Sequence, residues 1–303
     1  MDFFEENYLL LRYKQFLRFV FYKLTKSSRN IFVLCSDLIT VDIQLFGIHE
    51  PLLTKIISYF NKEGFNDFFL DVGANIGIST CQNGNDFKEV HLFEPNPLCR
   101  NIAFVNISVS LENDHWTLHP FGLGSNDYTG KLRVPKNNWG GGYIVGNDNS
   151  YDNLLLLNKE GQKIFKKEDY LEYQVLIKET YSTILNLFKE LVKGNKQNGV
   201  IKIDVEGMEP VILAGIAEAL LEEIKVVIIF ENFNEKLDFL EIINSFKGRA
   251  TGYFIDIESP FNYKDFKLIK LFKLLFKRKI KYKLMPFEKR YAAKNRDLIL
   301  VIS

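Results

Sequence analysis

The chain has 303 residues, of which 47% are hydrophobic and 25% are charged. This composition is typical of a globular protein with one large α/β domain or two smaller domains. The 39 basic and 38 acidic residues nearly cancel. This balance argues against a surface built as a whole to hold nucleic acid, although it is compatible with a local basic patch.

The three cysteines are Cys35, Cys81 and Cys99, and no two of them form a C-x-x-C pair. An odd number in a long chain makes a disulfide framework unexpected, so we expect reduced thiols in a cytoplasmic protein. Charged residues interrupt the N-terminal apolar stretch, which argues against a secretory signal. No charge-free apolar run approaches the roughly 20 residues that a membrane-spanning helix needs.

The N-terminal region, residues 1–64, is expected to form a helical and extended cap. Residues 3–24 carry apolar side chains at helical spacing and predict an amphipathic helix. Residues 31–46 are predicted to be extended. Residues 50–62 are predicted to be helical, with Pro51 in the first turn, where a missing N–H costs little.

From residue 65 to 303, short apolar runs alternate with helical patterns. Strands are predicted at 68–72, 89–93, 115–119, 200–205, 225–230, 251–257 and 297–302. Helices are predicted at 76–83, 97–109, 209–223 and 235–246. This alternation predicts an α/β fold with a Rossmann-like, doubly wound, mostly parallel sheet of seven strands, the last two forming an antiparallel edge pair. Ligands of such a sheet bind beyond the carboxyl ends of its strands.

Two insertions interrupt the predicted domain. Residues 120–198 are too long for one connection and predict extra strands, a substrate-facing loop and a helix at 179–193. Within them, Trp139, Gly140–Gly142 and Tyr143 would either line a sugar pocket or form a flexible loop. The second insertion, 260–290, is rich in lysine and apolar residues.

Nine lysines or arginines lie between residues 264 and 283 of the second insertion. This pattern suits peripheral contact with an anionic membrane or with a lipid-linked substrate. An ordinary helix with its lysines facing water is the alternative.

A glycine-rich turn, Asp71-Val72-Gly73-Ala74-Asn75-Ile76-Gly77, follows the first predicted strand. Gly73 has no Cβ and would let the backbone approach a ligand closely, and Gly77 would let the following helix pack closely. The helix N-terminus would offer free N–H groups to a carboxylate, and Asp71 could accept from an ammonium group. Asn75 stands where the dinucleotide fingerprint needs its second glycine, which disfavours a pyrophosphate.

Glu94 ends the next predicted strand, 23 positions after Asp71. An acidic residue in this position suits the diol of a ribose. Taken alone, the turn could be only a tight turn and Glu94 only a solvated carboxylate. Their occurrence on consecutive strands favours a ligand site.

Three motifs together, DVGANIG (71–77), FEPNP (93–97) and IKIDVEGMEPVILAG (201–215), resemble the FkbM-type methyltransferase family. The resemblance covers about residues 40–257, and the last strand, RDLILVIS, also fits. It implies a class I methyltransferase fold, S-adenosylmethionine as cofactor, and O-methylation of hydroxyls on sugars, glycans or polyketides. The cofactor residues that it implies are Asp71, Gly73, Ala74, Asn75, Gly77, Glu94 and Asn96, with Gly122 and Leu123 toward the adenine.

Lys202, Asp204 and Glu206 are the catalytic candidates. Because side chains alternate along a strand, these three charges would share one face and point into the cofactor crevice. A hydroxyl is a poor nucleophile until its proton is removed, so Asp204 or Glu206 could be the base, with Lys202 balancing the charge. The alternative is that Asp204 orients the loop and Glu206 binds substrate.

Glu231, at the end of the following strand, is a further candidate for the base. The carboxylates could instead hold a divalent cation, but no metal ligand is assigned.

The sequence thus predicts an S-adenosylmethionine-dependent O-methyltransferase acting on a small molecule or glycan. An NAD-dependent sugar oxidoreductase is a rival, against which Asn75 counts. A non-catalytic binding protein is another, against which the intact acidic residues count. A nucleic-acid substrate is not expected, because the chain has neither an Asp-Pro-Pro-Tyr nor an Asn-Pro-Pro-Tyr stretch. The expected location is the cytoplasm, including the membrane periphery.

Overall fold

The structure is a computed structural model, and it describes residues 2–25, 43, 48–112, 114–146, 149, 166–231, 238–258, 279–287 and 297–303. The chain forms two compact units, Met1–His49 with Tyr253–Tyr291, and Glu50–Gly252 with Ala292–Ser303. The expected boundary between residues 64 and 65 is therefore displaced. Residues 50–64 belong to the larger unit, and residues 253–291 group with the N-terminal region.

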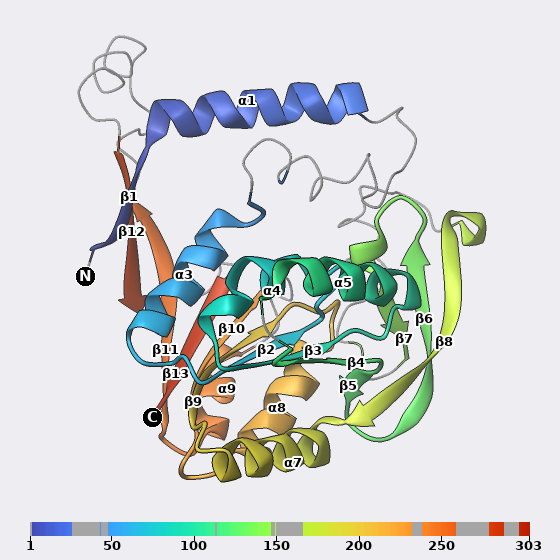
Figure 1. The fold of residues 1–303 in the computed structure, drawn as a ribbon, viewed down its shortest axis with the longest axis vertical. Helices are drawn as coiled ribbons and strands as arrows, with labels where there is room; N and C mark the ends of the chain where they lie inside the picture. The colour runs from blue at the N-terminus through green and yellow to red at the C-terminus, as the bar shows by residue number, and fades with distance from the viewer. Residues whose placement is uncertain are drawn as a thin grey trace. The chain divides into compact units, whose positions relative to one another are not determined.

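The larger unit is built on a mostly parallel sheet (Figure 1). Its strands are β2 (Phe68–Val72), β3 (Glu89–Phe93), β4 (Trp116–His119), β9 (Asn198–Ile203), β10 (Lys225–Glu231) and β13 (Asp297–Ile302). They lie in the order β13-β10-β9-β2-β3-β4, and the sheet order continues beyond β13 with β11 (Ala250–Glu258), which begins in this unit. Neighbouring strands from β10 to β4 are parallel, whereas β13 runs antiparallel to β10. All seven predicted strands lie in this mostly parallel sheet, but β11 and β13 do not form its edge, because the sheet has nine strands and continues beyond β11.

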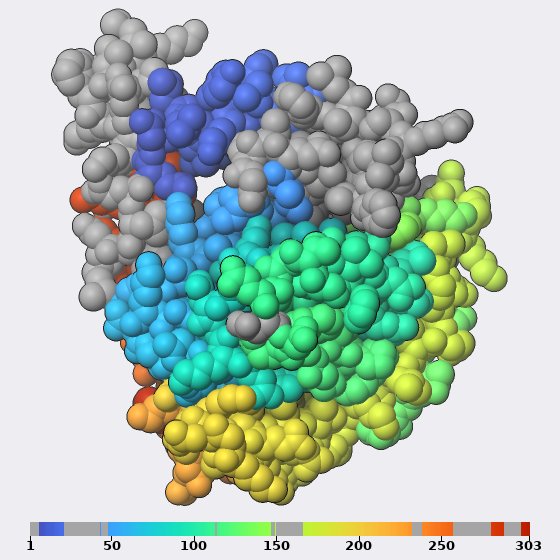
Figure 2. Space-filling model, viewed as in Figure 1, coloured from blue at the N-terminus to red at the C-terminus, as the bar shows by residue number. Residues whose placement is uncertain are grey.

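Helices cover both faces of this sheet, as a doubly wound fold requires. Figure 1 shows α3 (Pro51–Lys62), α4 (Ile78–Asn83) and α5 (Pro97–Ser110) on one face, and α7 (Thr180–Lys193), α8 (Glu209–Ala219) and α9 (Phe239–Ser245) on the other. All five residues of β2 are buried, which explains why its sequence is apolar at every position except Asp71 rather than alternating. Figure 2 shows the surface of this unit, with the yellow residues of α7 at its lower edge.

The insertion at 120–198 forms a second sheet within the larger unit. Its strands are β5 (Gly122–Gly124), β6 (Tyr128–Pro135), β7 (Tyr143–Val145) and β8 (Tyr170–Glu179), in the order β5-β8-β6-β7. Leu132, Val134, Ile144, Val175 and Ile177 form a core of their own in this sheet. The extra strands and the helix at 179–193 are therefore confirmed.

The smaller unit contains β1 (Asp2–Asn7), α1 (Tyr8–Thr25), β12 (Lys279–Pro286) and the later part of β11. β1 pairs antiparallel with β12, and β12 pairs antiparallel with β11. The prediction of one helix over 3–24 was wrong for residues 3–7, because β1 pairs with a strand near the other end of the chain.

Two expectations for the smaller unit fall largely outside the described residues. Almost all of the segment 31–46 does so, and so does most of the basic stretch 264–283. Lys279, Lys281 and Lys283 lie in a strand rather than in a helix. No helix in the described part of the chain has the length and apolarity needed to cross a membrane.

Candidate functional site

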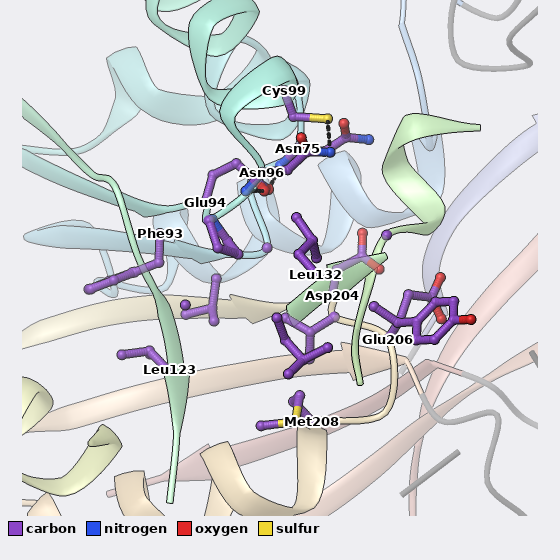
Figure 3. Close-up of a pocket in the computed structure, with 18 of the residues that line it drawn as sticks. Asn75, Phe93, Glu94, Asn96, Cys99, Leu123, Leu132, Asp204, Glu206 and Met208 are labelled. Atoms are coloured by element: carbon purple, nitrogen blue, oxygen red, sulfur yellow. Dashed lines mark hydrogen bonds between the residues drawn. The ribbon is translucent and has the colours of Figure 1, made fainter. Parts of the chain in front are cut away.

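A cavity lies where the carboxyl ends of β2, β3 and β9 meet (Figure 3). Its empty volume is about 740 Å³, open solvent included. Its lining from the strand ends includes Gly73, Asn75, Glu94, Asn96, Asp204 and Glu206. The second sheet and its loops contribute Gly122, Leu123, Leu132, Trp139, Gly140 and Tyr143. Two parts of the chain that are distant in sequence therefore build one site.

Most of the residues singled out in the sequence line this cavity. Five of the cofactor and catalytic candidates do not appear among the described lining residues, namely Asp71, Ala74, Gly77, Lys202 and Glu231. Leu132, Ile144 and Ile177 reach it from the second sheet without having been foreseen. They look like ordinary apolar strand residues, so nothing local marks them.

The glycines of the turn at 71–77 serve packing. Gly73 has a φ of 79°, and a Cβ on it would lie 1.9 Å from the carbonyl oxygen of Asp204. Gly77 also has a φ of 79°, and a Cβ there would lie 3.2 Å from Ile107 on α5. The close approach to Gly73 that was expected of a ligand is thus made by the Asp204 carbonyl of the chain itself. At Gly77, the close helix packing occurs as predicted.

The backbone amides of this turn are already hydrogen-bonded. The N–H groups of Gly73 and Ala74 donate to the carbonyl oxygen of Phe93, at 3.0 and 3.2 Å. Asn75 donates to Glu94 Oε2 at 2.7 Å, and Gly77 donates to the Ala74 carbonyl at 2.8 Å. These four amides therefore do not provide the free N–H groups that were expected to receive a carboxylate.

Asp71 and Lys202 form a buried charge network beside the cavity. Asp71 Oδ2 accepts from Thr80 Oγ1 at 2.8 Å, and Asp71 Oδ1 lies 3.2 Å from Lys202 Nζ. Lys202 Nζ also lies 3.1 Å from Asp204 Oδ2, and the Asp204 side chain is 47% exposed. Burial lowers the pKa of Lys202, but the carboxylates of Asp71 and Asp204 raise it more, so its net pKa lies above the ordinary value. Lys202 thus remains an ammonium between two carboxylates.

The shared strand face predicted for Lys202, Asp204 and Glu206 is not formed. Strand β9 ends at Ile203, so the alternation of side chains covers only Lys202. Asp204 and Glu206 lie in the following loop, and both still line the cavity. The backbone of this loop is fixed by Asn149, whose Nδ2 donates to the Glu206 carbonyl oxygen at 2.8 Å.

Glu94 is the buried acidic group of the cavity. Its Oε2 accepts from the Asn75 amide and its Oε1 from the Asn96 amide, both at 2.7 Å. Burial raises the pKa of Glu94 to about 7, although the two amides lower it. Because a carboxylate oxygen has two lone pairs, both oxygens can still accept from a pair of hydroxyls. The residues present therefore fit the ribose of the expected cofactor.

The loop around Trp139 is bound to the same end of β3. Asn96 Nδ2 donates to the Trp139 carbonyl oxygen at 3.2 Å, while Asn96 Oδ1 caps α5 by accepting from the Leu98 amide at 3.1 Å. A Cβ on Gly140 would lie 2.4 Å from Asn75 Nδ2. The loop predicted to face the acceptor thus lies on the cavity that contains Glu94.

A second cavity, with an empty volume of about 630 Å³ that includes open solvent, lies at the carboxyl ends of β9 and β10. Its polar lining consists of Glu50, Lys202, Asp204 and Glu231, and its apolar lining consists of Pro51, Leu52, Leu53, Ile203, Ile229 and Phe230. Asp204 belongs to both cavities. In the described part of the chain, no group of three or more His, Cys, Asp or Glu side chains could hold a metal ion.

Comparison with known proteins gives a family match and several distant structural matches. The sequence profile of a family described as "Methyltransferase FkbM domain" matches residues 71–255. No curated protein matches the chain significantly. Among solved structures, an FkbM methyltransferase from Methylobacillus flagellatus KT is 14% identical, with 93% of this chain and 58% of that chain covered and a TM-score of 0.39.

Two further solved structures are similar at the same level. A SAM-dependent O-methyltransferase from Thermotoga maritima is 13% identical, with 88% and 71% covered and a TM-score of 0.37. Magnesium protoporphyrin IX methyltransferase from Synechocystis PCC 6803, with bound SAM, is 8% identical, with 96% and 97% covered and a TM-score of 0.40.

Proposed function

We propose that this chain, which belongs to the FkbM methyltransferase family, methylates a hydroxyl group of a sugar or glycan. It is an S-adenosylmethionine-dependent methyltransferase. When bound, S-adenosylmethionine supplies an electrophilic methyl group. The proposal concerns the acceptor and the residues of this chain that would activate it.

The two cavities would bind different molecules, the cofactor in one and the acceptor in the other. The first cavity has the buried Glu94 carboxylate for a ribose, and its lining includes Gly122 and Leu123, which would face an adenine. The second cavity has carboxylates beside apolar side chains and would hold the acceptor. The observation that carries the proposal is that Asp204 lines both cavities, so its carboxylate would lie between donor and acceptor.

A hydroxyl acceptor must lose its proton as the new bond to carbon forms, and a carboxylate in reach can take that proton. Asp204 is the first candidate. If Asp204 accepted a proton, Lys202 would keep its partner Asp71, so no buried charge would be left unpaired. Glu206 on the first cavity and Glu231 on the second remain the other candidates.

The chemistry of the second cavity favours a neutral polyol. Three carboxylates and one ammonium line it, so an anionic group would be repelled, whereas several hydroxyls could donate to the carboxylates. Phe230 and Leu52 offer apolar surface for the C–H face of a sugar ring.

The experiment is a methyl-transfer assay with labelled S-adenosylmethionine and a panel of nucleotide sugars and glycans. We expect a methyl ether on a sugar hydroxyl, located by fragmentation in the mass spectrometer. Matched acceptors that carry an amine or a carboxylate instead of the hydroxyl serve as controls. Transfer to those controls alone would contradict the proposal.

A further inference from the structure

Helix α1 (Tyr8–Thr25) has an apolar face turned to solvent. Leu9, Tyr13 and Phe16 fall at helical spacing, and their exposed fractions are 44%, 58% and 63%. Leu10, on the same side, is 52% exposed. Large apolar side chains that gather on an exposed surface mark a site of interaction.

The charged residues of α1 are all basic. The helix has four side chains that are charged at neutral pH, namely Arg12, Lys14, Arg18 and Lys23, and it contains no Asp or Glu. Arg12 is exposed and lies one turn from both Leu9 and Phe16, at the edge of the apolar face, where its Nη1 donates to Gln15 Oε1 at 3.0 Å. The helix therefore combines a solvent-facing apolar face with charged residues that are all cationic.

The smaller unit as a whole also has a positive net charge in its sequence. Residues 1–49 and 253–291 together contain 17 Lys or Arg and 9 Asp or Glu, a net charge of +8. The remaining residues carry a net charge of −7, so the near-neutral total is the sum of two units of opposite net charge. Such an asymmetry is typical of a chain in which one part binds an anionic surface.

We propose that α1 binds the surface of an anionic lipid bilayer, with its Leu9, Tyr13 and Phe16 face inserted among the lipids and its basic residues at the headgroups. Amphipathic helices with this pattern lie in the plane of the interface. Each lysine or arginine near an anionic leaflet adds attraction that is screened by salt. A nucleic acid would satisfy the charges but would leave the apolar face in water, so a lipid surface explains both features.

The test is co-flotation of the full chain with vesicles of pure phosphatidylcholine and with vesicles that also contain phosphatidylglycerol. We expect binding to the anionic vesicles, weaker binding to the neutral ones, and a decrease as salt is raised. Replacing Leu9 and Phe16 together by glutamine keeps the net charge and the helix propensity. This variant should lower the partition coefficient at least tenfold, because two inserted apolar side chains are lost.

The matched control is Gln15→Ala, an exposed change on the polar side of the same helix, which should bind as the wild type does. Arg12→Gln should weaken binding to the anionic vesicles only. Calorimetric binding of S-adenosylmethionine checks that each variant is folded.

Three outcomes would overturn the proposal. The first is a wild-type chain that ignores anionic vesicles. The second is tighter binding to a DNA or RNA duplex than to vesicles. The third is self-association through α1, seen by light scattering as a dimer that the Leu9 and Phe16 variant abolishes without any change in flotation.

Discussion

Asp71 and Lys202 are register partners on the adjacent parallel strands β2 and β9, and their side chains form a buried ion pair with 3.2 Å between Oδ1 and Nζ. Asp71 is fully buried, and Lys202 is 5% exposed. The pair joins the strand that carries the glycine turn to the strand that leads to Asp204. Both residues therefore affect the site by joining the strands that carry it.

Breaking this pair should destabilise the fold. Lys202→Met would leave Asp71 as an uncompensated buried charge, and we expect the free energy of unfolding to fall by about 3–5 kcal/mol. Urea denaturation measures this change. Lys225→Met, an exposed change at the start of β10, is the control and should have little effect. Equal losses for the two variants would contradict a structural role for the pair.

Cofactor binding should depend on the ionisation of Glu94. Its raised pKa of about 7 in the free protein means that the ionised form, which accepts two hydroxyls, is fully present only above pH 7. Hydroxyl donors stabilise that form, so affinity should be highest above pH 7 and should fall up to tenfold per pH unit below it. Calorimetry at several pH values, in buffers of different ionisation enthalpy, should show proton release on binding at pH 6.

Glu94→Gln should weaken S-adenosylmethionine binding by about 1–3 kcal/mol and remove this pH dependence, because the amide does not ionise in this range. A variant with wild-type affinity and the same pH profile would exclude Glu94 from ribose binding.

The Trp139 loop should affect the cofactor and not only the acceptor. An alanine at Gly140 would push against the Asn75 side chain, whereas a Cβ at Gly146 meets nothing within 4 Å. We expect Gly140→Ala to weaken S-adenosylmethionine binding several-fold with little loss of stability, because a flexible side chain can move aside. Gly146→Ala should leave the dissociation constant unchanged, and identical constants for both variants would argue against the contact.

One carboxylate should be essential for turnover. Replacing the true base by its amide should lower kcat by about 10²–10⁴, the usual contribution of general-base catalysis, while cofactor affinity survives. Asp204→Asn is the first test, Glu206→Gln and Glu231→Gln follow, and Glu218→Gln on the exposed side of α8 is the control. If all three variants keep near-normal kcat at saturating acceptor, none of them is the base. Loss of activity with a chelator, restored by Mg²⁺, would instead indicate a metal held by these carboxylates.

A histidine pair, with His91 buried and His119 half-buried, should make the fold sensitive to acid. His91 Nδ1 lies 3.2 Å from His119 Nε2, and His91 Nε2 lies 2.8 Å from Glu89 Oε1. Burial lowers the pKa of His91, and it lowers the pKa of His119 to about 4. Since unfolded histidine titrates near pH 6.5, this contribution to stability is complete above that pH and is lost as the pH falls toward 4.

His119→Phe should therefore have a flatter dependence of unfolding free energy on pH between 7 and 5 than the wild type. The new ring can keep the stacking on Phe93, whose ring centroid lies 4.4 Å from that of His119. Parallel curves for the two proteins would show that the pKa of His119 is the same in the folded and the unfolded protein.

The strands and helices of the central sheet could be predicted because their patterns are local. The buried strands read as continuous apolar runs, and prolines mark the first turns of α3, α5 and α8. The glycine turn and Glu94 were recognisable for the same reason, since each lies directly after such a run. Strand β9 shows the limit, because its end at Ile203, two residues before the predicted end, changes which side chains share a face.

The partners of these residues depend on contacts between distant parts of the chain. Three such contacts shape the site: the turn amides donate to β3, Asp71 pairs with Lys202, and the Trp139 loop lies against Asn75. Each joins segments that no local sequence pattern relates. Residues 2–7 became a strand for the same reason, since β12 supplies their hydrogen bonds. Asp204 belongs to two cavities because β9 lies between β2 and β10, and strand order is a property of the packed sheet rather than of any one segment.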